Sequence, residues 1–404
     1  MSTKTYVSDL LNRLPESATL AMARMSRELK EEGKDVISLS LGEPDFNAPD
    51  FVKEACKQAV DDDYSHYPPV NGYGELREAI CHKFKRDNDL VYTPDQIVVS
   101  TGAKQTISNV VYALVNPGDE VLLPAPFWVS YAAMVQLAGG VPVIIPTQIE
   151  NDFKITAEEL KAHISDKTRL MIYSSPCNPS GSVYSKDELT ALAEVIKSKP
   201  DFFVVSDEIY EHINYTGEHA SLGTIPGIFD QVITVNGVSK AFAMTGYRIG
   251  YLGAPTWIAK ACSKMQGQVT SAPSGVSQMA AKAAVLADPS SVSYMKDAFL
   301  KRRDMMLEKL GEIPGLKLNV PEGAFYIFPN CMELLGTVTD DGKEINTSSD
   351  LCMYLLQAEN VALVAGDAFG AAECFRLSYA ASEEMLVEAA VRMKRAFGKL
   401  KKQN

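Results

Sequence analysis

The sequence predicts an α/β protein in which helices enclose a mixed, mostly parallel sheet, together with a smaller α+β domain. Three observations lead to this fold class. Short runs of valine, isoleucine and leucine recur along the chain, segments with helical spacing separate them, and the pattern changes from about residue 297. Continuous apolar runs are typical of strands that are buried on both faces of a parallel sheet.

The predicted strands are bounded by proline, glycine or aspartate. They are 96–100, 120–123, 141–145, 170–173, 202–205 and 232–235. The segments between them predict crossover helices, and in 187–197, for example, Leu189 and Ile196 fall on one helix face. A seventh run, 247–252, follows its predecessor too closely for a full crossover helix, so we expect it to be an antiparallel neighbour.

The last quarter of the chain predicts the smaller domain. It begins with a long charged helix and ends with a helix that starts at Ser382. Between them we expect a strand, a polar insertion to which we assign no role, a helix and a second strand. The ranges of the first helix, the first strand, the insertion and the second strand are 295–310, 324–328, 337–349 and 361–364.

The first residues are expected to join that smaller domain. The stretch through Leu39 has too few apolar residues for a core of its own, so it must pack on another part of the chain. The predicted domains are an N-terminal arm with a segment of the small domain (1–48), a large domain (49–296) and a C-terminal small domain (297–404).

Composition excludes several classes of function. A formal charge of -12 and a pI of about 5.1 argue against nucleic acid as a partner. The chain starts with polar residues and no run reaches the roughly 18 apolar residues of a membrane span, so we expect neither secretion nor a membrane partner. Seven scattered cysteines without a CxxC pair, and five histidines without an HExxH motif, indicate reduced thiols in the cytoplasm and no metal site.

Lys240 is the first candidate for chemistry. It follows the strand 232–235, lies among small residues, and precedes Arg248 by eight positions. A lone lysine after a strand is ordinarily a solvated residue. A lysine that forms a Schiff base, however, needs close backbone approach and a nearby cation to neutralise a phosphate dianion. Arg248 is the candidate anchor for that phosphate, and Ser239 is a candidate hydroxyl.

Asp207 closes the buried strand 202–205, where an unpaired carboxylate is costly. One interpretation is that it caps a following helix. The functional interpretation is that it pairs with the protonated nitrogen of a pyridine ring and keeps that ring an electron sink. Tyr210, about one turn later, is placed to bond a ring hydroxyl.

Two further segments predict anion sites. Gly102, Ala103 and Lys104 join a strand to a helix, and the backbone N–H groups of such a turn form a phosphate cradle at Ala103 and Lys104. The dinucleotide and P-loop motifs GxGxxG and GxxxxGK[ST] are absent from the sequence. Arg376 lies in an apolar run, and a buried guanidinium needs an anion, either a structural carboxylate or a ligand.

Together these segments resemble the class I aminotransferases, which depend on pyridoxal phosphate. The resemblance is plainest around Lys240, where the family has a signature of the form SxxKxxxxxxxR followed by a glycine. It implies the pyridoxal-phosphate-dependent transferase fold type I, with Lys240 as the catalytic Schiff-base lysine and with Asp207 and Tyr210 at the cofactor ring. Gly237 stands where a serine is often found, so that phosphate contact is lost or passes to Ser239.

The resemblance implies roles for further residues. Asn178, in an N-P-x-G loop, corresponds to the asparagine that contacts the ring oxygen and the substrate carboxylate. Trp128, which taken alone would be a core aromatic, corresponds to the residue that stacks on the pyridine ring. Arg376 corresponds to the arginine that holds the substrate α-carboxylate in a two-pronged contact, and Gly42 to the loop that closes over it. Tyr67 corresponds to a tyrosine that reaches the phosphate of the neighbouring subunit, which implies a homodimer with shared active sites.

Specificity depends on the residues that bind the distal carboxylate. One branch of the aspartate aminotransferases uses an arginine of the partner subunit, but this chain has no arginine between Arg248 and Arg302. A second branch resembles it closely at 17–19, 42–46, 103–105 and 240–246. There, the lysine of the G-x-K-Q turn and a Ser/Thr pair near the start bind the distal carboxylate, so Lys104 and Thr19 are expected to do so here. The alternative for Lys104 is a solvated lysine, but a cation at a helix start opposes the helix dipole.

The resemblance therefore implies an aspartate aminotransferase, which transfers the amino group of L-aspartate to 2-oxoglutarate and yields oxaloacetate and L-glutamate. Prephenate, aromatic and other amino-acid aminotransferases share the cofactor residues and are alternatives, as is a pyridoxal-phosphate-dependent lyase. A cofactor-binding regulatory module is not expected, because no basic helix-turn-helix segment is attached.

Overall fold

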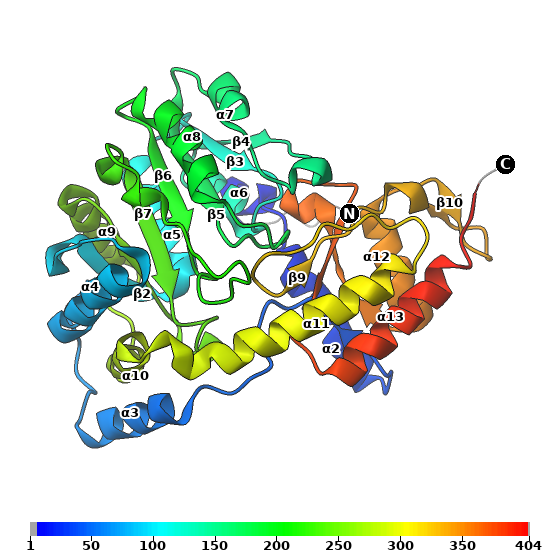
Figure 1. Ribbon diagram of the computed structural model, residues 1–404, viewed down its shortest axis with the longest axis horizontal. Coiled ribbons are helices and arrows are strands. Elements are labelled where there is room, and N and C mark those ends of the chain that lie inside the picture. The colour runs from blue at the N-terminus through cyan, green and yellow to red at the C-terminus, as the bar shows by residue number, and fades with distance from the viewer. Residues whose placement is uncertain (1–5, 403–404) are drawn as a thin grey trace.

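The computed structural model describes residues 6–402 (Figure 1). A seven-stranded sheet with its helices forms one side of the molecule, and a smaller group of helices and short strands lies beside it. The fold class expected from the sequence is confirmed. The limits of the three domains stay a prediction, and residues 1–5 of the first one lie outside the described range.

The central sheet has the strand order β2-β8-β7-β6-β5-β3-β4. All six predicted strands are present, and the seventh run, β8, is antiparallel to both β2 and β7 as expected. The other neighbouring strands are parallel, so the carboxyl ends of β2, β3, β5, β6 and β7 meet at one edge, where α/β sheets bind ligands. The strands are β2 (Ile97–Thr101), β3 (Glu120–Pro124), β4 (Val141–Ile145), β5 (Thr168–Ser174), β6 (Phe203–Asp207), β7 (Val232–Gly237) and β8 (Ile249–Gly253).

Helices cover both faces of the sheet because its strands are apolar on both sides. In β5, Leu170 and Ile172 pack against α5, α6 and α9, whereas Met171 and Tyr173 pack against α7 and α8. Two more helices, α4 and α10, pack beside β2 and β8, and α3 packs on α10. The bounds are α3 (Asp50–Asp61), α4 (Gly74–Asn88), α5 (Gly102–Leu114), α6 (Ser130–Leu137), α7 (Ala157–His163), α8 (Lys186–Lys197), α9 (Thr256–Val269) and α10 (Gly275–Leu286).

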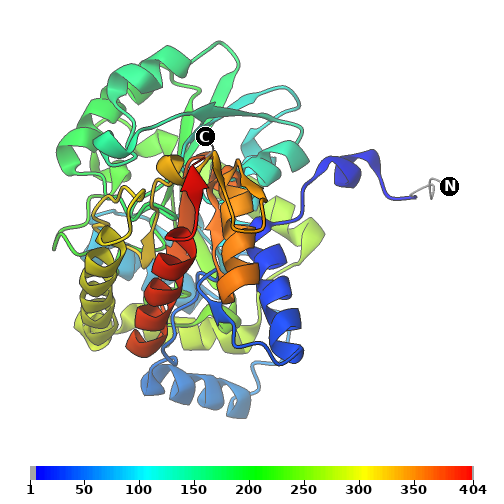
Figure 2. The same cartoon turned by 90° about the vertical axis from the view of Figure 1, so that its right-hand side faces the viewer.

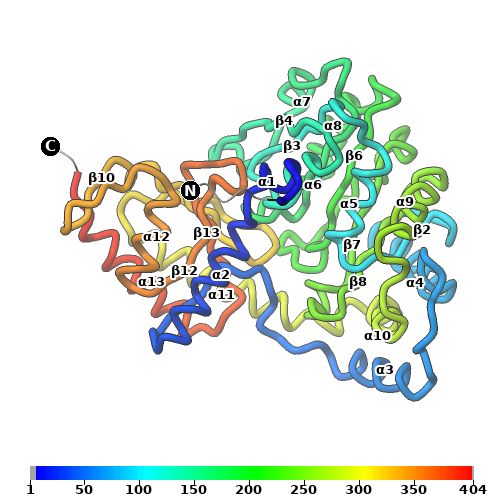
Figure 3. Tube along the Cα trace, turned by 180° about the vertical axis from the view of Figure 1, so that it is seen from behind, coloured from blue at the N-terminus to red at the C-terminus, as the bar shows by residue number. Residues whose placement is uncertain are grey.

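The smaller lobe combines the two ends of the chain. A parallel pairing of β1 with β12 and the packing of α2 against β12 and β13 hold the N-terminal stretch on this lobe, as expected (Figure 3). The short helix α1 projects away from the rest and buries none of its residues (Figure 2). The bounds are α1 (Asp9–Arg13), α2 (Ala18–Glu31), β1 (Ile37–Ser38), α11 (Ser293–Gly311), α12 (Ser348–Glu359), β12 (Val361–Ala362), β13 (Val364–Ala365), β14 (Phe375–Ser378) and α13 (Glu383–Phe397).

Two predicted strands of this lobe differ in the structure. The strand expected at 324–328 is limited to β9 (Tyr326–Ile327), because Ala324 has a positive φ of 56° and its N–H bonds the carbonyl of Ile213 instead. The strand expected at 361–364 is divided at Leu363 into β12 and β13, which join different sheets.

The polar insertion at 337–349 has a simple structure. It forms a hairpin of β10 (Thr337–Val338) and β11 (Glu344–Ile345), which β15 (Lys401–Lys402) extends, and then starts α12. The seven cysteines are all free. Within residues 6–402 no helix has the length and apolarity to cross a membrane.

A buried charge network supports the turn that follows β6. Lys83 on α4 forms an ion pair with Glu211, and both side chains are at most 4% exposed. Asn88 donates hydrogen bonds to Glu208 (3.0 Å) and Glu211 (2.6 Å), and the ring of His219 bonds Glu208 at 2.8 Å. Buried charges stabilise a fold only when they are paired in this way. The network therefore fixes the segment that begins at the end of β6.

Replacing Lys83 by methionine is expected to lower the free energy of unfolding by about 3 kcal/mol, because it leaves the buried Glu211 carboxylate without its cation. Urea denaturation measures the change. The matched control is Lys85→Met on the same helix, whose pair with Asp89 is 60% and 80% exposed and is worth less than about 1 kcal/mol. Equal losses in the two variants would show that the network adds nothing beyond a surface pair.

Candidate active site

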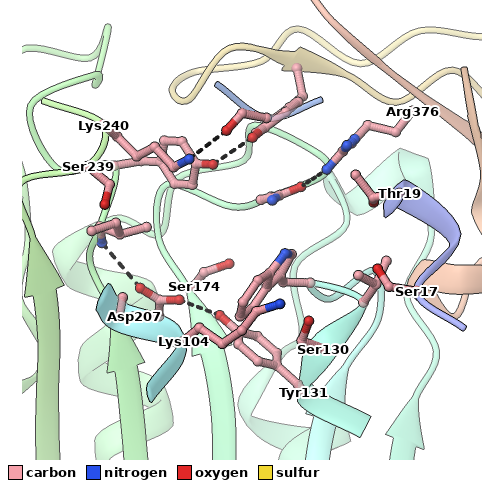
Figure 4. A pocket seen from close by; sticks show the side chains of 18 of the residues that line it. Ser17, Thr19, Lys104, Ser130, Tyr131, Ser174, Asp207, Ser239, Lys240 and Arg376 are labelled. Carbon is pink, nitrogen blue, oxygen red and sulfur yellow. Dashed lines mark hydrogen bonds between the residues drawn. The ribbon is translucent and has the colours of Figure 1, made fainter. Parts of the chain in front are cut away.

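A cavity of about 230 Å³ opens at the carboxyl edge of the sheet, where the smaller lobe covers it (Figure 4). Twelve of the thirteen residues expected from the sequence line it. They are Thr19, Gly42, Ala103, Lys104, Trp128, Asn178, Asp207, Tyr210, Ser239, Lys240, Arg248 and Arg376. Tyr67, the thirteenth, is outside the cavity and 96% exposed.

The cavity collects positive charge. Four cationic side chains line it against one carboxylate, that of Asp207. Lys240 donates to the carbonyl of Gly42 at 2.5 Å and Arg248 to the carbonyl of Thr245 at 3.0 Å, both of which are neutral acceptors. An anion with several negative charges is therefore the ligand that this cavity suits.

Lys240 lies on the turn after β7 and lines the cavity. Burial lowers the pKa of its amine, and the charges of Arg248 and Arg376 act in the same direction, while Glu43 and Asp207 oppose them, so that the pKa is about 8. An amine with this pKa is neutral in a useful fraction near neutral pH. It can then act as a nucleophile and as a base.

Asp207 is the last residue of β6 and is buried. Its Oδ2 accepts a hydrogen bond of 2.6 Å from the hydroxyl of Tyr131, and its Oδ1 accepts one of 3.3 Å from the N–H of Ile209. Burial raises the pKa of Asp207 to about 6, although both hydrogen bonds oppose the rise. In the part of the chain that the structure describes, Asp207 is followed by turns and not by a helix, so the interpretation that its carboxylate caps a helix is wrong.

The start of α5 forms an anion site together with Arg248. The first N–H groups of a helix have no partner within it and carry partial positive charge. A side chain at Gly102 would place its Cβ 2.5 Å from Nη2 of Arg248, and one at Gly250 would overlap the N–H of Ala103. Both glycines are required for Arg248 and the helix start to approach one another. The site therefore fits a phosphate group.

Gly237 explains why the expected serine is missing. It pairs with Gly250 across β7 and β8. A Cβ at Gly237 would lie 2.8 Å from the carbonyl oxygen of Ile249 and 3.0 Å from Cα of Gly250. A serine side chain does not fit between these two paired strands, whereas Ser239, two residues later, lines the cavity.

Arg376 on β14 lies at the far end of the cavity and is 1% exposed. Its Nη1 donates to Oδ1 of Asn178 at 3.0 Å, its Nη2 donates to the carbonyl of Ser40, and its buried Nε has no hydrogen-bond partner. The guanidinium lies over the ring of Tyr326, 4.6 Å from the ring centroid. Burial lowers the pKa of Arg376. A buried cation whose hydrogen-bond partners are neutral groups fits a carboxylate of a ligand.

Lys104 and Thr19 also line the cavity. The ammonium of Lys104 is 4.9 Å from the ring centroid of Trp128, and burial together with the charge of Arg248 lowers the pKa of Lys104. Thr19 has a buried hydroxyl without a hydrogen-bond partner. Figure 4 shows Thr19 and Ser17 on the side of Arg376, across the cavity from Asp207 and Ser239.

Some residues that line the cavity were not predicted from the sequence. Tyr131, the hydrogen-bond partner of Asp207, comes three residues after Trp128. This spacing of almost one helical turn could have predicted that both side chains face the cavity. Tyr326 comes from β9, far away in the sequence, and gave no signal. Ser174 ends β5 beside Asp207 in register and has a buried hydroxyl without a partner.

Comparisons with known proteins agree with this geometry. The sequence model of the family described as aminotransferase class I and II matches residues 34–393. An aspartate aminotransferase of Pinus pinaster is 48% identical over 92% of this chain and 77% of its own length. A probable aspartate/prephenate aminotransferase of Rhizobium leguminosarum bv. phaseoli is 44% identical over 98% of this chain and 100% of its own.

Solved structures give the same result. The aspartate aminotransferase of Rhizobium meliloti superposes with a TM-score of 0.94 at 42% identity, covering 98% of this chain and 100% of that one. That of Thermus thermophilus, solved with maleate, gives 0.91 at 39% identity over 97% and 100%. With the lysine, the carboxylate and the phosphate site in one cavity, the chain belongs to the class I and II aminotransferases, enzymes that use pyridoxal phosphate to move amino groups between amino acids and oxo acids.

Proposed function

We propose that this enzyme transfers the amino group of L-aspartate reversibly to 2-oxoglutarate, giving oxaloacetate and L-glutamate. The observation that carries the proposal is the cationic cavity, in which Arg376 and Lys104 are available for two carboxylates besides the phosphate site at Arg248. The names of its relatives from pine and Rhizobium support aspartate as the substrate.

Lys240 is the residue that moves the proton. When bound, pyridoxal phosphate supplies an electron sink that stabilises negative charge at the substrate α-carbon. The neutral amine of Lys240 would take the α-proton of the amino acid and deliver it to the cofactor carbon that receives the amino group, and with the oxo acid it would move a proton in the opposite direction. Asp207 would hold a proton on the ring nitrogen, and the hydrogen bond that its carboxylate accepts from Tyr131 fixes the orientation of that carboxylate.

The remaining residues orient the two ligands. Arg376 and Asn178 hold the α-carboxylate, and the Gly42 loop closes over it. Trp128 stacks on the cofactor ring, Tyr210 bonds the ring hydroxyl, and the groups at Ala103, Ser239 and Arg248 hold the phosphate. Lys104 and Thr19 bind the distal carboxylate, for which the unpartnered Thr19 hydroxyl is a suitable donor.

The assembly that we infer is a cytoplasmic homodimer with shared active sites. Tyr67 is 96% exposed, which suits a residue that reaches the phosphate of a partner subunit. The projecting segment around α1 exposes apolar side chains that a second subunit would cover. They are Tyr6, Val7, Leu10 and Leu11. Free cysteines throughout agree with a reducing compartment.

A second candidate activity is amino transfer to prephenate. Relatives of Petunia hybrida and Rhizobium leguminosarum are named for both aspartate and prephenate. Prephenate also has two carboxylates, so the same pair, Arg376 and Lys104, would bind it. Turnover of prephenate with aspartate as donor distinguishes the dual activity from aspartate transfer alone.

Replacing Lys240 by alanine is expected to abolish the visible absorption of the cofactor-loaded protein, because the covalent link needs this amine. In the unaltered protein, aspartate should bleach the band and 2-oxoglutarate should restore it, as a spectrophotometric titration measures. Lys161→Ala, an exposed lysine on α7, is the control and should retain the band. A band that responds to alanine or tyrosine but not to aspartate would contradict the proposed substrate.

Replacing Lys104 by alanine is expected to lower kcat/KM for aspartate by about 10- to 100-fold, the value of one charge-assisted hydrogen bond. For alanine as donor, which has no distal carboxylate, the loss should stay below about threefold. Steady-state kinetics with both donors in one variant give the comparison. Equal losses would instead assign Lys104 to the phosphate.

A further inference from the structure

Two tyrosine hydroxyls meet inside the cavity. Tyr210, on the turn after β6, and Tyr326, on β9 of the smaller lobe, have their hydroxyl oxygens 2.6 Å apart. Both side chains are buried, at 3% and 0% exposure, and both line the cavity. Each hydroxyl has a single hydrogen, so in this contact one tyrosine donates and the other accepts.

The position of Arg376 favours one of the two tyrosines as the donor. Its guanidinium lies 4.6 Å from the ring centroid of Tyr326. Burial raises the pKa of Tyr326, and the positive charge of Arg376 opposes that rise. The pKa of Tyr210 is well above its ordinary value because of burial and then of Tyr326 itself, and Arg376 opposes this rise too. A cation directly over the ring of Tyr326 stabilises negative charge on its oxygen, which favours Tyr326 as the donor and Tyr210 as the acceptor. The hydrogen of Tyr210 is then free to point into the cavity.

Gly42 shows that the place of the Tyr326 hydroxyl is constrained. A Cβ at Gly42 would overlap this hydroxyl, so any larger residue would displace it. The carbonyl of the same glycine accepts the hydrogen bond of Lys240. The backbone of Gly42 therefore lies next to both the Tyr326 hydroxyl and the Lys240 amine.

We propose that Tyr326 is a positioning residue, which donates to Tyr210 and thereby directs the Tyr210 proton at the ring oxygen of the cofactor. The inference rests on the proposed function. It assigns a task to Tyr326, a residue of the smaller lobe. The same lobe holds the substrate carboxylate through Arg376. It also predicts that removing the Tyr326 hydroxyl changes the proton equilibrium of the bound cofactor through Tyr210.

The test is Tyr326→Phe, which keeps the ring under Arg376 and removes the hydroxyl alone. A hydrogen bond donated to the ring oxygen stabilises its anion and weakens its hold on the proton of the neighbouring Lys240 nitrogen. Weakening that donor is therefore expected to raise the midpoint of the spectral pH titration of the loaded protein by about 0.5 to 1 unit, a factor of about 3 to 10 in the proton equilibrium. Equilibrium dialysis should show a similar loss of pyridoxal phosphate affinity.

Two further variants separate positioning from packing. Tyr379→Phe removes another buried hydroxyl, which contacts Tyr215 at 3.1 Å outside the cavity, and should leave the midpoint unchanged. In a Tyr210→Phe background, Tyr326→Phe should add no further shift, because the path through Tyr210 is already lost.

An unshifted midpoint in Tyr326→Phe, or an equal shift in both backgrounds, would overturn the inference. A failure of the proposed function looks different, because the visible band of the unaltered protein would then still titrate with pH but would not be bleached by aspartate.

Discussion

The structure depends on one charge relation: four cationic side chains meet at a cavity that contains one carboxylate. The chain as a whole carries a formal charge of -12, so this local excess is not a general property of its surface. The partners of Lys240, Arg248 and Arg376 are carbonyls and an amide, which leave the charges uncompensated until anions bind. A phosphate and one or two carboxylates supply that compensation, and the cofactor and substrate of an aminotransferase carry these groups.

The sheet makes this concentration of charge possible. Parallel strands bring their carboxyl ends to one edge, so residues far apart in the sequence meet there without a long loop. Gly237 and Gly250 pair between β7 and β8, and Gly102 starts α5. The absence of side chains at Gly250 and Gly102 lets Arg248 and the start of the helix approach one another. The buried ion pair of Lys83 and Glu211 fixes the turn that follows Asp207. Charges inside the scaffold are thus paired with opposite charges, whereas the positive charges of the cavity are left for ligands to neutralise.

Much of this was predictable from sequence, for physical reasons. The strands are continuous apolar runs, and the spacing from Lys240 to Arg248 places both residues at one sheet edge. Side-chain contacts between distant segments were not predictable: Tyr326 reaches Tyr210 only because β9 folds over the sheet. The strand expected at 324–328 is shorter than expected, because the positive φ of Ala324 is set by tertiary contacts, which residue preference does not report. Tyr67 lies outside the cavity of one chain, so its role stays a prediction.

The acidity of the Lys240 amine tests the central claim most directly. Burial and the nearby guanidinium groups lower its pKa to about 8, whereas an ordinary lysine titrates near 10.4. Neutral amine is the reactive form, so acetylation of Lys240 in cofactor-free protein should increase with pH and level off above about pH 8. Mass spectrometry of the Lys240 peptide measures that rate. A rate that keeps rising through about pH 10, as for an ordinary lysine, would contradict the account.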